Sequence, residues 1–539
     1  MGRWSVLLLL CVSQFVMILD STVMNVSIST VASDLGTTIT GMQAAITFYA
    51  LTMAAFMLTG GKLGDRWGRA RAFRIGAVVY GLGSLTTALS PNLTVLMLGW
   101  SLVEGLGAVL VIPAIAALAA VNYSGRERVV AFSALGAATG IAAAAGPLIG
   151  GLVTTYASWR FVFAAETIVM IVVLLLSGRI KDAAREDAVR IDLGSVILSA
   201  GGMALLVFAV LQSKSWGWIV PLDPPVVGGV TIAPFGVSPV AYLILLAIVV
   251  LWLFVRRQRH LERTGGSPLL KVGLLGIPAL RSGLAMFLSQ YFAIAALFFV
   301  VPVYLQTIQG YDALQTGLRI LPLSLGLILF SVVGSRLSTV RSPRQIARWG
   351  QGVLALGVLL VFAAVQPDLA GVIFAIGMFI VGSGFGLLAS QLGNVNMSAV
   401  SAADTSEVGG LQGTFQNLGS SFGTALVGSV FILLLTSGFT GAIESSDLPS
   451  SIRQQVVAAT ETGTPILSQA EAEQALEAGG ATPDEAAQIA QTYAETQVAS
   501  LRQALFLVFA LAVVALMLSR GLPREVAAAA EPEPQARGV

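Results

Sequence analysis

The chain has 539 residues, of which 56% are hydrophobic and 11% are charged, and its formal net charge is +2. Soluble globular proteins carry about 25% charged residues, so this composition excludes a soluble globular protein and predicts an integral membrane protein. A single cysteine, Cys11, and a single histidine, His260, exclude a disulfide framework and a thiolate metal cage. We therefore expect no metal site and no organic cofactor.

A window of about 20 residues, the length with which a helix crosses a bilayer, predicts fourteen apolar spans. They lie at residues 5–27, 42–60, 72–90, 94–120, 129–153, 159–178, 191–212, 238–256, 282–305, 317–335, 350–366, 370–397, 410–436 and 503–519. The first span resembles a signal peptide, but it is too long and lacks a small-residue cleavage site. We expect it to stay in the mature protein.

The basic residues divide unequally between the two sides of this alternating path. With Met1 in the cytoplasm, only Arg160, Lys214, Arg319, Arg453 and Arg502 of the 30 Lys and Arg residues lie outside. Cytoplasmic loops of membrane proteins are enriched in Lys and Arg, so this asymmetry supports both the span count and the orientation. Both termini are expected in the cytoplasm.

One long outside segment, residues 439–502, separates the last two spans. It carries nine acidic and two basic residues. Ser468 with Glu471 and Thr482 with Glu485 each have the form of a capping box, so two helices are predicted here, and the second can continue into the last span. A solvated acidic cap is the interpretation we favour over a partner surface or an electrostatic attractor of cations.

Two stretches suggest an internal repeat. "LTGGKLGDRWGR" ends the second span and "FSVVGSRLSTVRSPR" ends the tenth, each passing from an apolar run through glycine into a basic loop. Such echoes predict two related helix bundles, the architecture in which transporters place a binding site at the midplane between repeats.

Three acids lie inside predicted spans: Asp20, Glu104 and Glu166. Asp20 and Glu104 are expected at similar depth, about 12 and 15 Å from the outer end of their spans. An ionised acid at the bilayer centre costs about 2.5 to 3.5 kcal/mol, so such residues usually face a cavity and have a function. We expect them to exchange between a protonated state and a state paired with a cationic substrate. The alternative is that each only forms a hydrogen bond inside a packed bundle.

Several motifs resemble those of the major facilitator superfamily, and of its fourteen-span drug:proton antiporters in particular. "GKLGDRWGR" is similar to the cytoplasmic loop signature and contains Gly61, Asp65, Arg66, Gly68 and Arg69. "LDSTVMNV", with Asp20 and Asn25, looks like the first-span signature. "GAATGIAAAAGPLIGG" is similar to the fifth-span antiporter motif, through Gly140, Gly146, Pro147, Gly150 and Gly151.

The resemblance implies an all-α membrane protein with the major facilitator fold, in which two six-helix bundles flank two inserted spans. The expected division is residues 1–180 for the first bundle, 181–265 for the inserted spans with their cytoplasmic linkers, 266–525 for the second bundle and 526–539 for a cytoplasmic tail. The family also implies export by alternating access, and a bacterial cytoplasmic membrane as the location.

The loop and fifth-span motifs each allow two interpretations. Asp65 beside Arg66 and Arg69 can form charge-assisted contacts that break when the bundles rock, which makes a conformational latch; basic residues alone would only signal topology. Asp404 and Glu407 are expected near this latch. In the fifth span, glycines permit close helix packing and Pro147 permits a bend, so tight packing and a gating role are both open.

The sequence departs from the family pattern at two membrane positions. Ser101 and Glu104 stand where relatives usually have arginine and glutamine, and Glu166 stands where asparagine is frequent. Both changes make the first bundle more acidic, which predicts a preference for lipophilic cations. The second bundle contributes amides and aromatic residues suited to broad recognition, namely Gln290, Tyr304, Gln306, Gln391 and Asn394.

The sequence thus predicts a proton-coupled exporter of lipophilic, cationic drugs that works in the lipid bilayer and is not an enzyme. No GxxxxGK[ST] loop is present, so an ATP-driven pump is disfavoured, and nucleotide or nucleic-acid binding finds no support. The alternative within transport is export of an endogenous metabolite or lipid. A membrane sensor or scaffold that uses the acidic external loop is a more distant alternative.

Overall fold

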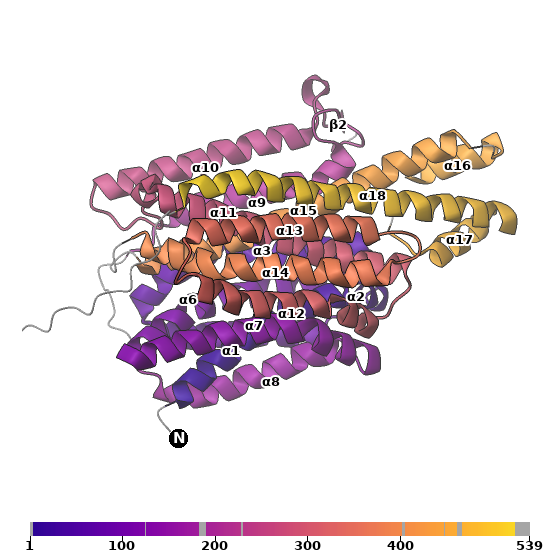
Figure 1. Cartoon of the computed structure of the whole chain (residues 1–539). Coiled ribbons are helices and arrows are strands. Elements are labelled where there is room, and N and C mark those ends of the chain that lie inside the picture. The colour runs from indigo at the N-terminus through magenta and orange to yellow at the C-terminus, as the bar shows by residue number, and fades with distance from the viewer. Residues whose placement is uncertain are drawn as a thin grey trace, which may run out of the picture.

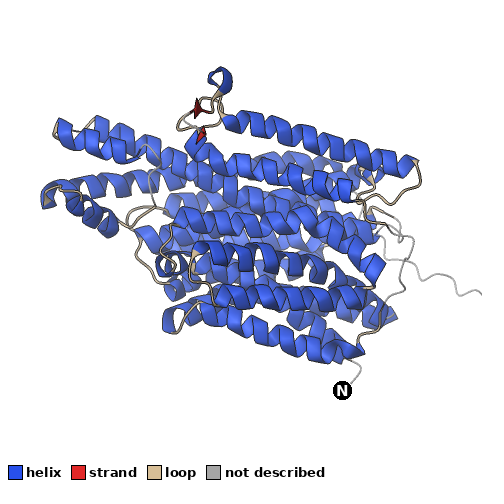
Figure 2. Cartoon of the chain, turned by 180° about the vertical axis from the view of Figure 1, so that it is seen from behind, coloured by secondary structure: helices blue, strands red, loops and turns tan. Residues whose placement is uncertain are grey.

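The computed structural model describes residues 4–123, 125–182, 190–227, 230–400, 405–446, 448–460 and 466–522. Nearly all of this chain is helical, and long helices lie side by side along one common direction (Figures 1 and 2). A two-residue antiparallel pairing of β1 (Val226–Val227) with β2 (Val230–Thr231) is a small exception between two spans. An all-α membrane fold is therefore confirmed.

The first bundle is built from six long helices, with α7 packed on α1, α4 between α6 and α8, and α3 against α6. The elements of this region are α1 (Ser5–Val26), α2 (Ile28–Asp34), α3 (Ile39–Trp67), α4 (Arg69–Ala88), α5 (Leu93–Leu96), the π-helix η1 (Met97–Glu104), α6 (Gly105–Asn122), α7 (Gly125–Tyr156), α8 (Arg160–Leu176) and the short η2 (Ser177–Arg179). Thus α5, η1 and α6 form one continuous span.

The second bundle packs α12 and α13 on α14, and α11 on α15, with α18 closing the bundle against α11, α13 and α15. Its elements are η4 (Val272–Gly276), α11 (Pro278–Val303), the π-helix η5 (Tyr304–Ile308), α12 (Ala313–Leu337), α13 (Pro343–Ala364), α14 (Gly371–Ser398), α15 (Thr405–Glu444), α16 (Ser450–Thr460), α17 (Gln469–Ala478), α18 (Pro483–Leu518) and η7 (Ser519–Gly521). Asp312 with Gln315 and Ser342 with Gln345 form capping boxes that start α12 and α13.

Two further helices, α9 (Leu193–Trp216) and α10 (Pro239–Arg263), connect the bundles, with the short η3 (Pro234–Gly236) just before α10. They pack on each other, and α9 also packs on α3 and α15, so the pair lies against the seam between the bundles. The bundles contact each other mainly through α3 with α15 and through α7 with α12.

Each of the fourteen predicted spans falls on a helix. Within the described residues, eleven helices are long and apolar enough to cross a membrane, and α7 makes twelve if its two halves, bent by 44°, count as one span. The other two are α4, with 20 residues, and α8, with 17. The count of fourteen membrane crossings therefore stays a prediction.

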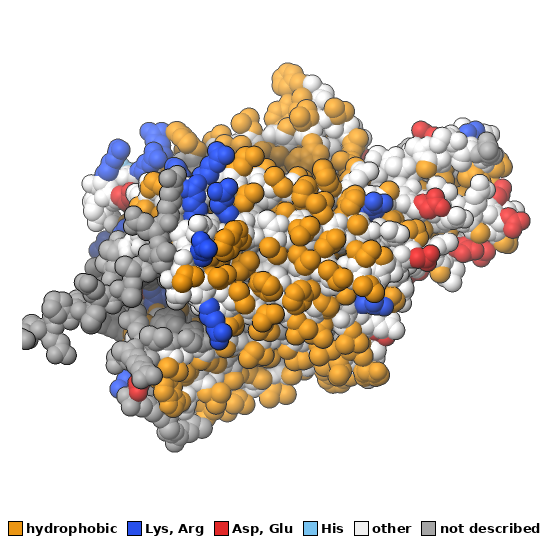
Figure 3. All heavy atoms as spheres, viewed as in Figure 1, with side chains coloured by type: hydrophobic (Ala, Val, Ile, Leu, Met, Phe, Trp, Pro, Cys, Tyr) orange, Lys and Arg blue, Asp and Glu red, His pale blue; other side chains and the backbone are white. Residues whose placement is uncertain are grey.

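Charge is distributed unequally along the helix direction. Figure 3 shows a broad belt of apolar side chains with Lys and Arg gathered at one end, the basic end, and Asp and Glu at the other, the acidic end. The acidic end carries α16, α17 and the first turns of α18. Both predicted capping boxes are present there, and α18 runs unbroken from the cap into the last predicted span.

Candidate functional site

A cavity of about 270 Å³ lies between the bundles. The first bundle contributes side chains from α1, α3, η1, α6 and α7, and the second from α11, α12, α14 and α15. Most are apolar or aromatic, with a few amides and hydroxyls among them. The lining side chains include Met17, Met53, Met57, Tyr49, Trp100, Tyr291, Phe298, Phe385, Asn25, Thr139, Gln290 and Asn417.

The three membrane acids meet inside the first bundle. Asp20 from α1, Glu104 from η1 and Glu166 from α8 each bring a carboxylate oxygen within 4.8 Å of the other two. Asp20 and Glu104 are 0% exposed and Glu166 is 2% exposed. The expected similar depth of Asp20 and Glu104 thus corresponds to direct proximity, and Glu166 completes an acid cluster.

Few donors reach the acid cluster. The Trp100 indole Nε1 donates to Asp20 Oδ1 at 2.8 Å, and the hydroxyls of Tyr80 and Ser84 each lie 3.4 Å from Glu166 Oε2. Both oxygens of Glu104 and one oxygen of each other acid have no partner with good hydrogen-bond geometry, although the hydroxyls of Tyr80 and Ser84 also lie near Glu104 and that of Tyr49 lies near Asp20. Among the described residues, none of the three acids has a salt bridge. Such a site favours bound protons over three free charges, because mutual repulsion and burial both disfavour ionisation.

An aromatic pair separates the acid cluster from the cavity. The rings of Tyr49 and Trp100 stack with centroids 4.7 Å apart and an interplanar angle of 5°. Both rings line the cavity, whereas none of the three acids is among its described lining residues. This differs from the expectation that the acids face the cavity directly. Sequence spacing fixes depth in the membrane, but it does not reveal which neighbouring ring covers a side chain.

Two of the other predicted binding residues line the cavity and three do not. Asn25 and Gln290 line it. Tyr304 donates to the Gln366 carbonyl at 2.6 Å, and Gln391 donates to the Gly334 carbonyl at 3.0 Å, so each joins two elements of the second bundle. Gln306 reaches α1, as described below. The side chain of Asn394 lies outside the described residues.

Gln306 joins the bundles near the acidic end. Its amide donates to the Val26 carbonyl at 2.6 Å, and its oxygen accepts from the Ser29 hydroxyl. In this structure the amide and hydroxyl groups of Tyr304, Gln306 and Gln391 bond to other segments of the protein, and a contact of these residues with cargo stays a prediction. Sequence analysis instead missed Tyr49 and Trp100, which look like ordinary core aromatics when the fold is unknown.

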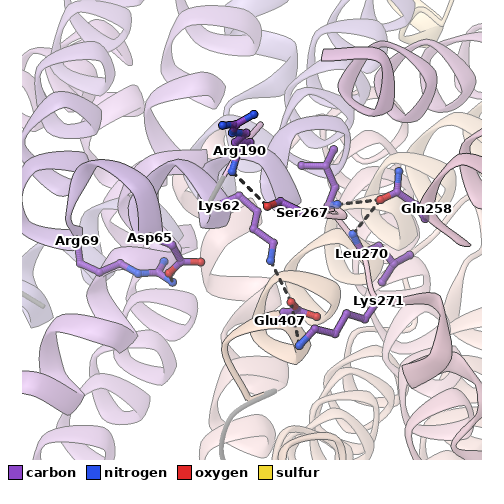
Figure 4. Close-up of polar contacts among 10 residues, drawn as sticks. Lys62, Asp65, Arg69, Arg190, Gln258, Ser267, Leu270, Lys271 and Glu407 are labelled. Atoms are coloured by element: carbon purple, nitrogen blue, oxygen red, sulfur yellow. Dashed lines mark hydrogen bonds and ion pairs between the residues drawn. The ribbon is translucent and has the colours of Figure 1, made fainter. Parts of the chain in front are cut away.

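At the basic end, an ion-pair network links the bundles (Figure 4). Lys62 Nζ in α3 lies 3.0 Å from Glu407 Oε1 in α15, and Lys271 Nζ lies 3.4 Å from the same oxygen. Asp65, near the end of α3, forms an ion pair with Arg69, the first residue of α4. Lys62 is the residue of the loop motif that reaches the other bundle. Sequence analysis placed Glu407 here, and Asp404 lies outside the described residues.

The remaining latch candidates shape the turn between α3 and α4. Gly68 has φ of +92°, a conformation that side chains rarely adopt, and Asp182 accepts from the backbone N–H of Ala70 at 2.8 Å just beyond it. Arg66 is exposed in the last turn of α3. Gly61 has open space where a side chain would begin. Of the five, Asp65, Gly68 and Arg69 thus have defined structural roles.

Comparison with known proteins decides the family. The model of the Major Facilitator Superfamily matches residues 10–191 and 222–424. The chain belongs to this superfamily. It is 30% identical over 438 residues to the puromycin resistance protein of Streptomyces alboniger, which covers 79% of this chain and 82% of that protein. It is 28% identical to the probable actinorhodin transporter of Streptomyces coelicolor, over 85% of this chain and 77% of that protein.

Solved structures of other transporters share the fold. A bacterial homologue of the human lysosomal transporter Spinster has a TM-score of 0.63 and 16% identity, and the match covers 96% of this chain and 97% of that one. As a member of the Major Facilitator Superfamily, the chain is a membrane transporter and not an enzyme.

Most glycines of the fifth-span motif lie where α7 packs closely on its neighbouring helices. A side chain at Gly150 would lie 2.9 Å from Val23 of α1, and one at Gly151 would lie 2.8 Å from Leu314 of α12. The backbone carbonyl of Pro147 packs where a side chain at Gly317 of α12 would begin, and Gly146 packs on Thr22. Gly140 instead lines the cavity. The motif therefore fits α7 between α1 of its own bundle and α12 of the other.

Proposed function

We propose that the chain is a proton-coupled exporter of lipophilic, cationic compounds that works by alternating access. The observation that carries the proposal is the cluster of Asp20, Glu104 and Glu166, enclosed beside a cavity between the two bundles. Three acids with few donors and no cationic partner among the described residues form a group that gains and loses protons as its surroundings change.

The membrane potential supplies the energy for this exchange. A proton that moves inward gains about 2.3 kcal/mol per 100 mV, in addition to any pH gradient. If the acid cluster takes protons from the acidic end and releases them at the basic end, it can drive cargo in the opposite direction. The positive-inside rule makes the basic end cytoplasmic, with both termini inside a bacterial cytoplasmic membrane.

The cavity suits lipophilic cations. Faces of Tyr49, Trp100 and Tyr291 offer cation–π contacts, and methionines adapt to differently shaped cargo. The acid cluster lies directly behind the Tyr49–Trp100 pair, so its negative charge after proton release favours a cation in the cavity. A related multidrug resistance protein of Mycobacterium tuberculosis is 27% identical over 82% of this chain, which supports drug export.

Alternating access requires contacts that break in each half of the cycle. At the basic end these are Lys62 and Lys271 with Glu407. At the acidic end they are Gln306 with α1, and α7 with α12. We propose that the two sets open in alternation, with the loop motif and Glu407 as the latch of the cytoplasmic side.

The test is ethidium efflux from energised cells that express the chain, with an uncoupler as a control. We expect efflux that the uncoupler abolishes, and we expect Asp20→Asn and Glu104→Gln to abolish it as well. Glu477→Gln removes an exposed acid from α17 and serves as the matched control. Uncoupler-sensitive efflux that survives both membrane substitutions would refute the role of the acid cluster.

Export of an endogenous metabolite is the second candidate. The names of two relatives favour it, the probable actinorhodin transporter and the cephamycin export protein of Amycolatopsis lactamdurans, the latter 29% identical over 81% of this chain. If well-folded protein at the membrane exports no ethidium, comparison of secreted metabolites between producing cells with and without the gene distinguishes this candidate.

A further inference from the structure

Trp100 contacts both the acid cluster and the cavity. Its indole N–H donates to Asp20 at 2.8 Å, while its ring, stacked on Tyr49, lines the cavity. The acids themselves are not among the described lining residues. We propose that protons and cargo occupy separate sites and that Trp100 is the positioning residue that couples them. This inference rests on the proposed proton-coupled export.

The hydrogen bond gives Trp100 a reason to respond to protonation. An indole N–H can only donate, and its bond to a carboxylate is charge-assisted and stronger than its bond to a neutral acid. With Asp20 ionised, Trp100 is therefore held firmly in the wall of the cavity. With Asp20 protonated, that restraint weakens and the ring can leave the position that a cation contacts.

The local backbone favours such a movement. Trp100 and Glu104 both belong to η1, a π-helical segment within a longer α-helical span. π-helical segments are rare inside α-helices and occur frequently at functional sites. One short segment thus carries an acid of the cluster and the aromatic ring of the cavity wall.

Other titratable groups surround Asp20 and share in its proton binding. These are Tyr49 on α3, Tyr80 on α4, Glu104 on η1 and Glu166 on α8. None of these four groups is basic. The acid cluster therefore loses negative charge by binding protons and not by pairing with one of these neighbours. Trp100 donates to Asp20 at 2.8 Å and lines the cavity, and Tyr49, stacked on it, also hydrogen-bonds to Asp20 and lines the cavity.

The test measures ethidium binding to purified protein by fluorescence anisotropy as a function of pH. For the wild type, we expect the dissociation constant to rise as pH falls, by up to about tenfold per pH unit for one linked proton. Trp100→Phe keeps a ring but removes the N–H. We expect it to reduce this slope to less than about half, with only a small change in affinity at acidic pH, where Asp20 is protonated in both proteins.

Trp159 provides a matched control. It is also a buried tryptophan of the first bundle, but its indole donates to Asp34 at 2.9 Å and not to an acid of the cluster, and it lies outside the described cavity lining. Trp159→Phe should keep the wild-type slope. A wild-type slope in Trp100→Phe would overturn the inference while proton-linked binding stands, whereas no slope in the wild type would overturn both proposals.

A second variant decides the matter if Trp100→Phe does not fold. Asp20→Asn keeps an oxygen that accepts from the indole, but it cannot change charge. If protons and cargo bind separately, this variant still binds ethidium, with an affinity near that of the wild type at acidic pH and with a smaller pH slope than the wild type. Complete loss of binding would mean that cargo pairs with Asp20 directly, and the inference would be wrong.

Discussion

Glu104 is the acid of the cluster whose carboxylate is least well hydrogen-bonded. It is 0% exposed, and neither of its carboxylate oxygens has a hydrogen-bond partner with good geometry. An unsatisfied buried polar group costs about 1 to 3 kcal/mol, and more when it is charged. This residue is therefore expected to lower stability, and the proposed proton coupling gives a reason for its presence.

Replacement of this acid by its amide should stabilise the protein. Glutamine has two N–H donors that can reach the carboxylates of Asp20 and Glu166, and it adds no negative charge. We expect Glu104→Gln to raise the free energy of unfolding by about 1 to 3 kcal/mol, measured by thermal unfolding in detergent at neutral pH. Glu477→Gln, on the exposed face of α17, should leave it unchanged. A destabilised Glu104→Gln protein would show that the acid has a structural partner.

The sequence was informative about these acids only up to a point. Three ionisable residues in apolar spans were enough to single out the site, because the cost of burial does not depend on the fold. Their meeting point was less predictable. Glu166 follows Asp20 by 146 positions, and only the packing of α8 on α4 and α1 brings the two together. The same limit explains why Trp100 was missed and why the bond of Tyr304 to the Gln366 carbonyl was not foreseen.

At the scale of elements, α7 differs on its two sides. Gly150 packs on α1, a neighbour in the same bundle, whereas Gly151 packs on α12 of the opposite bundle. Leu314 of α12 also donates its backbone N–H to the Thr155 hydroxyl at 3.1 Å. In the proposed alternating-access cycle, adjacent glycines thus serve two purposes, since the contact of Gly150 within the bundle persists and that of Gly151 between the bundles must break.

A side chain at Gly151 should hold the acidic end open. Gly151→Val would place methyl groups against the backbone of Ala313 and Leu314, and such overpacking costs about 1 to 3 kcal/mol. We expect the closed population to fall by roughly 5- to 150-fold. Spin labels at Tyr156 and Leu318, both exposed, should report longer distances.

Gly136→Ala is the control for this experiment. It lies in the same helix, with open space where the methyl group would go, and should leave the label distances unchanged. Unchanged distances in Gly151→Val as well would mean that α7 and α12 stay together despite the added side chain, and would contradict the prediction.

The inserted helices α9 and α10 belong to the latch through the linker that follows them. Gln258 of α10 accepts from the backbone N–H groups of Leu269 and Leu270 at 2.8 and 3.3 Å, and the next residue is Lys271, which pairs with Glu407 (Figure 4). At the start of α9, the guanidinium of Arg257 holds the pKa of Asp192 well below its usual range. The helix pair therefore positions one of the two cations of the latch.

Charge reversal tests whether Lys62 and Glu407 act together. Lys62→Glu places two acids opposite each other, and we expect it to slow ethidium efflux more than the neutral Lys62→Met. The double variant Lys62→Glu/Glu407→Lys should recover part of the rate, since a coupled pair contributes about 0.5 to 3 kcal/mol. Recovery stays partial because Lys271 would then face another lysine. A double variant as slow as Lys62→Glu, at equal membrane abundance, would exclude a direct pair.

At the scale of the whole molecule, composition and charge predicted much of the architecture. Apolar windows placed fourteen helices, and the capping boxes at Ser468 and Thr482 placed the helices of the acidic cap. Both signals depend on residues that are close together in the chain, so a single sequence is enough to detect them. The contacts between the bundles, α3 with α15 and α7 with α12, are not local; the internal repeat and the family resemblance predicted two bundles but not which helices meet.

Whether α4 and α8 cross the membrane decides between fourteen spans and a smaller number. These two helices are short or weakly apolar, so their crossing needs a direct test. In a Cys11→Ser background, single cysteines can be placed at Arg71 in the first turn of α4, at Pro91 between α4 and α5, and at Lys181 beyond α8, and all three positions are exposed. We expect a membrane-impermeant maleimide to label Pro91→Cys in intact cells, and to label Arg71→Cys and Lys181→Cys only after permeabilisation. Equal labelling of Arg71→Cys and Pro91→Cys would mean that α4 does not cross. Equal labelling of Pro91→Cys and Lys181→Cys would mean the same for α8, because the spans of α6 and α7 alone return the chain to the side from which it started.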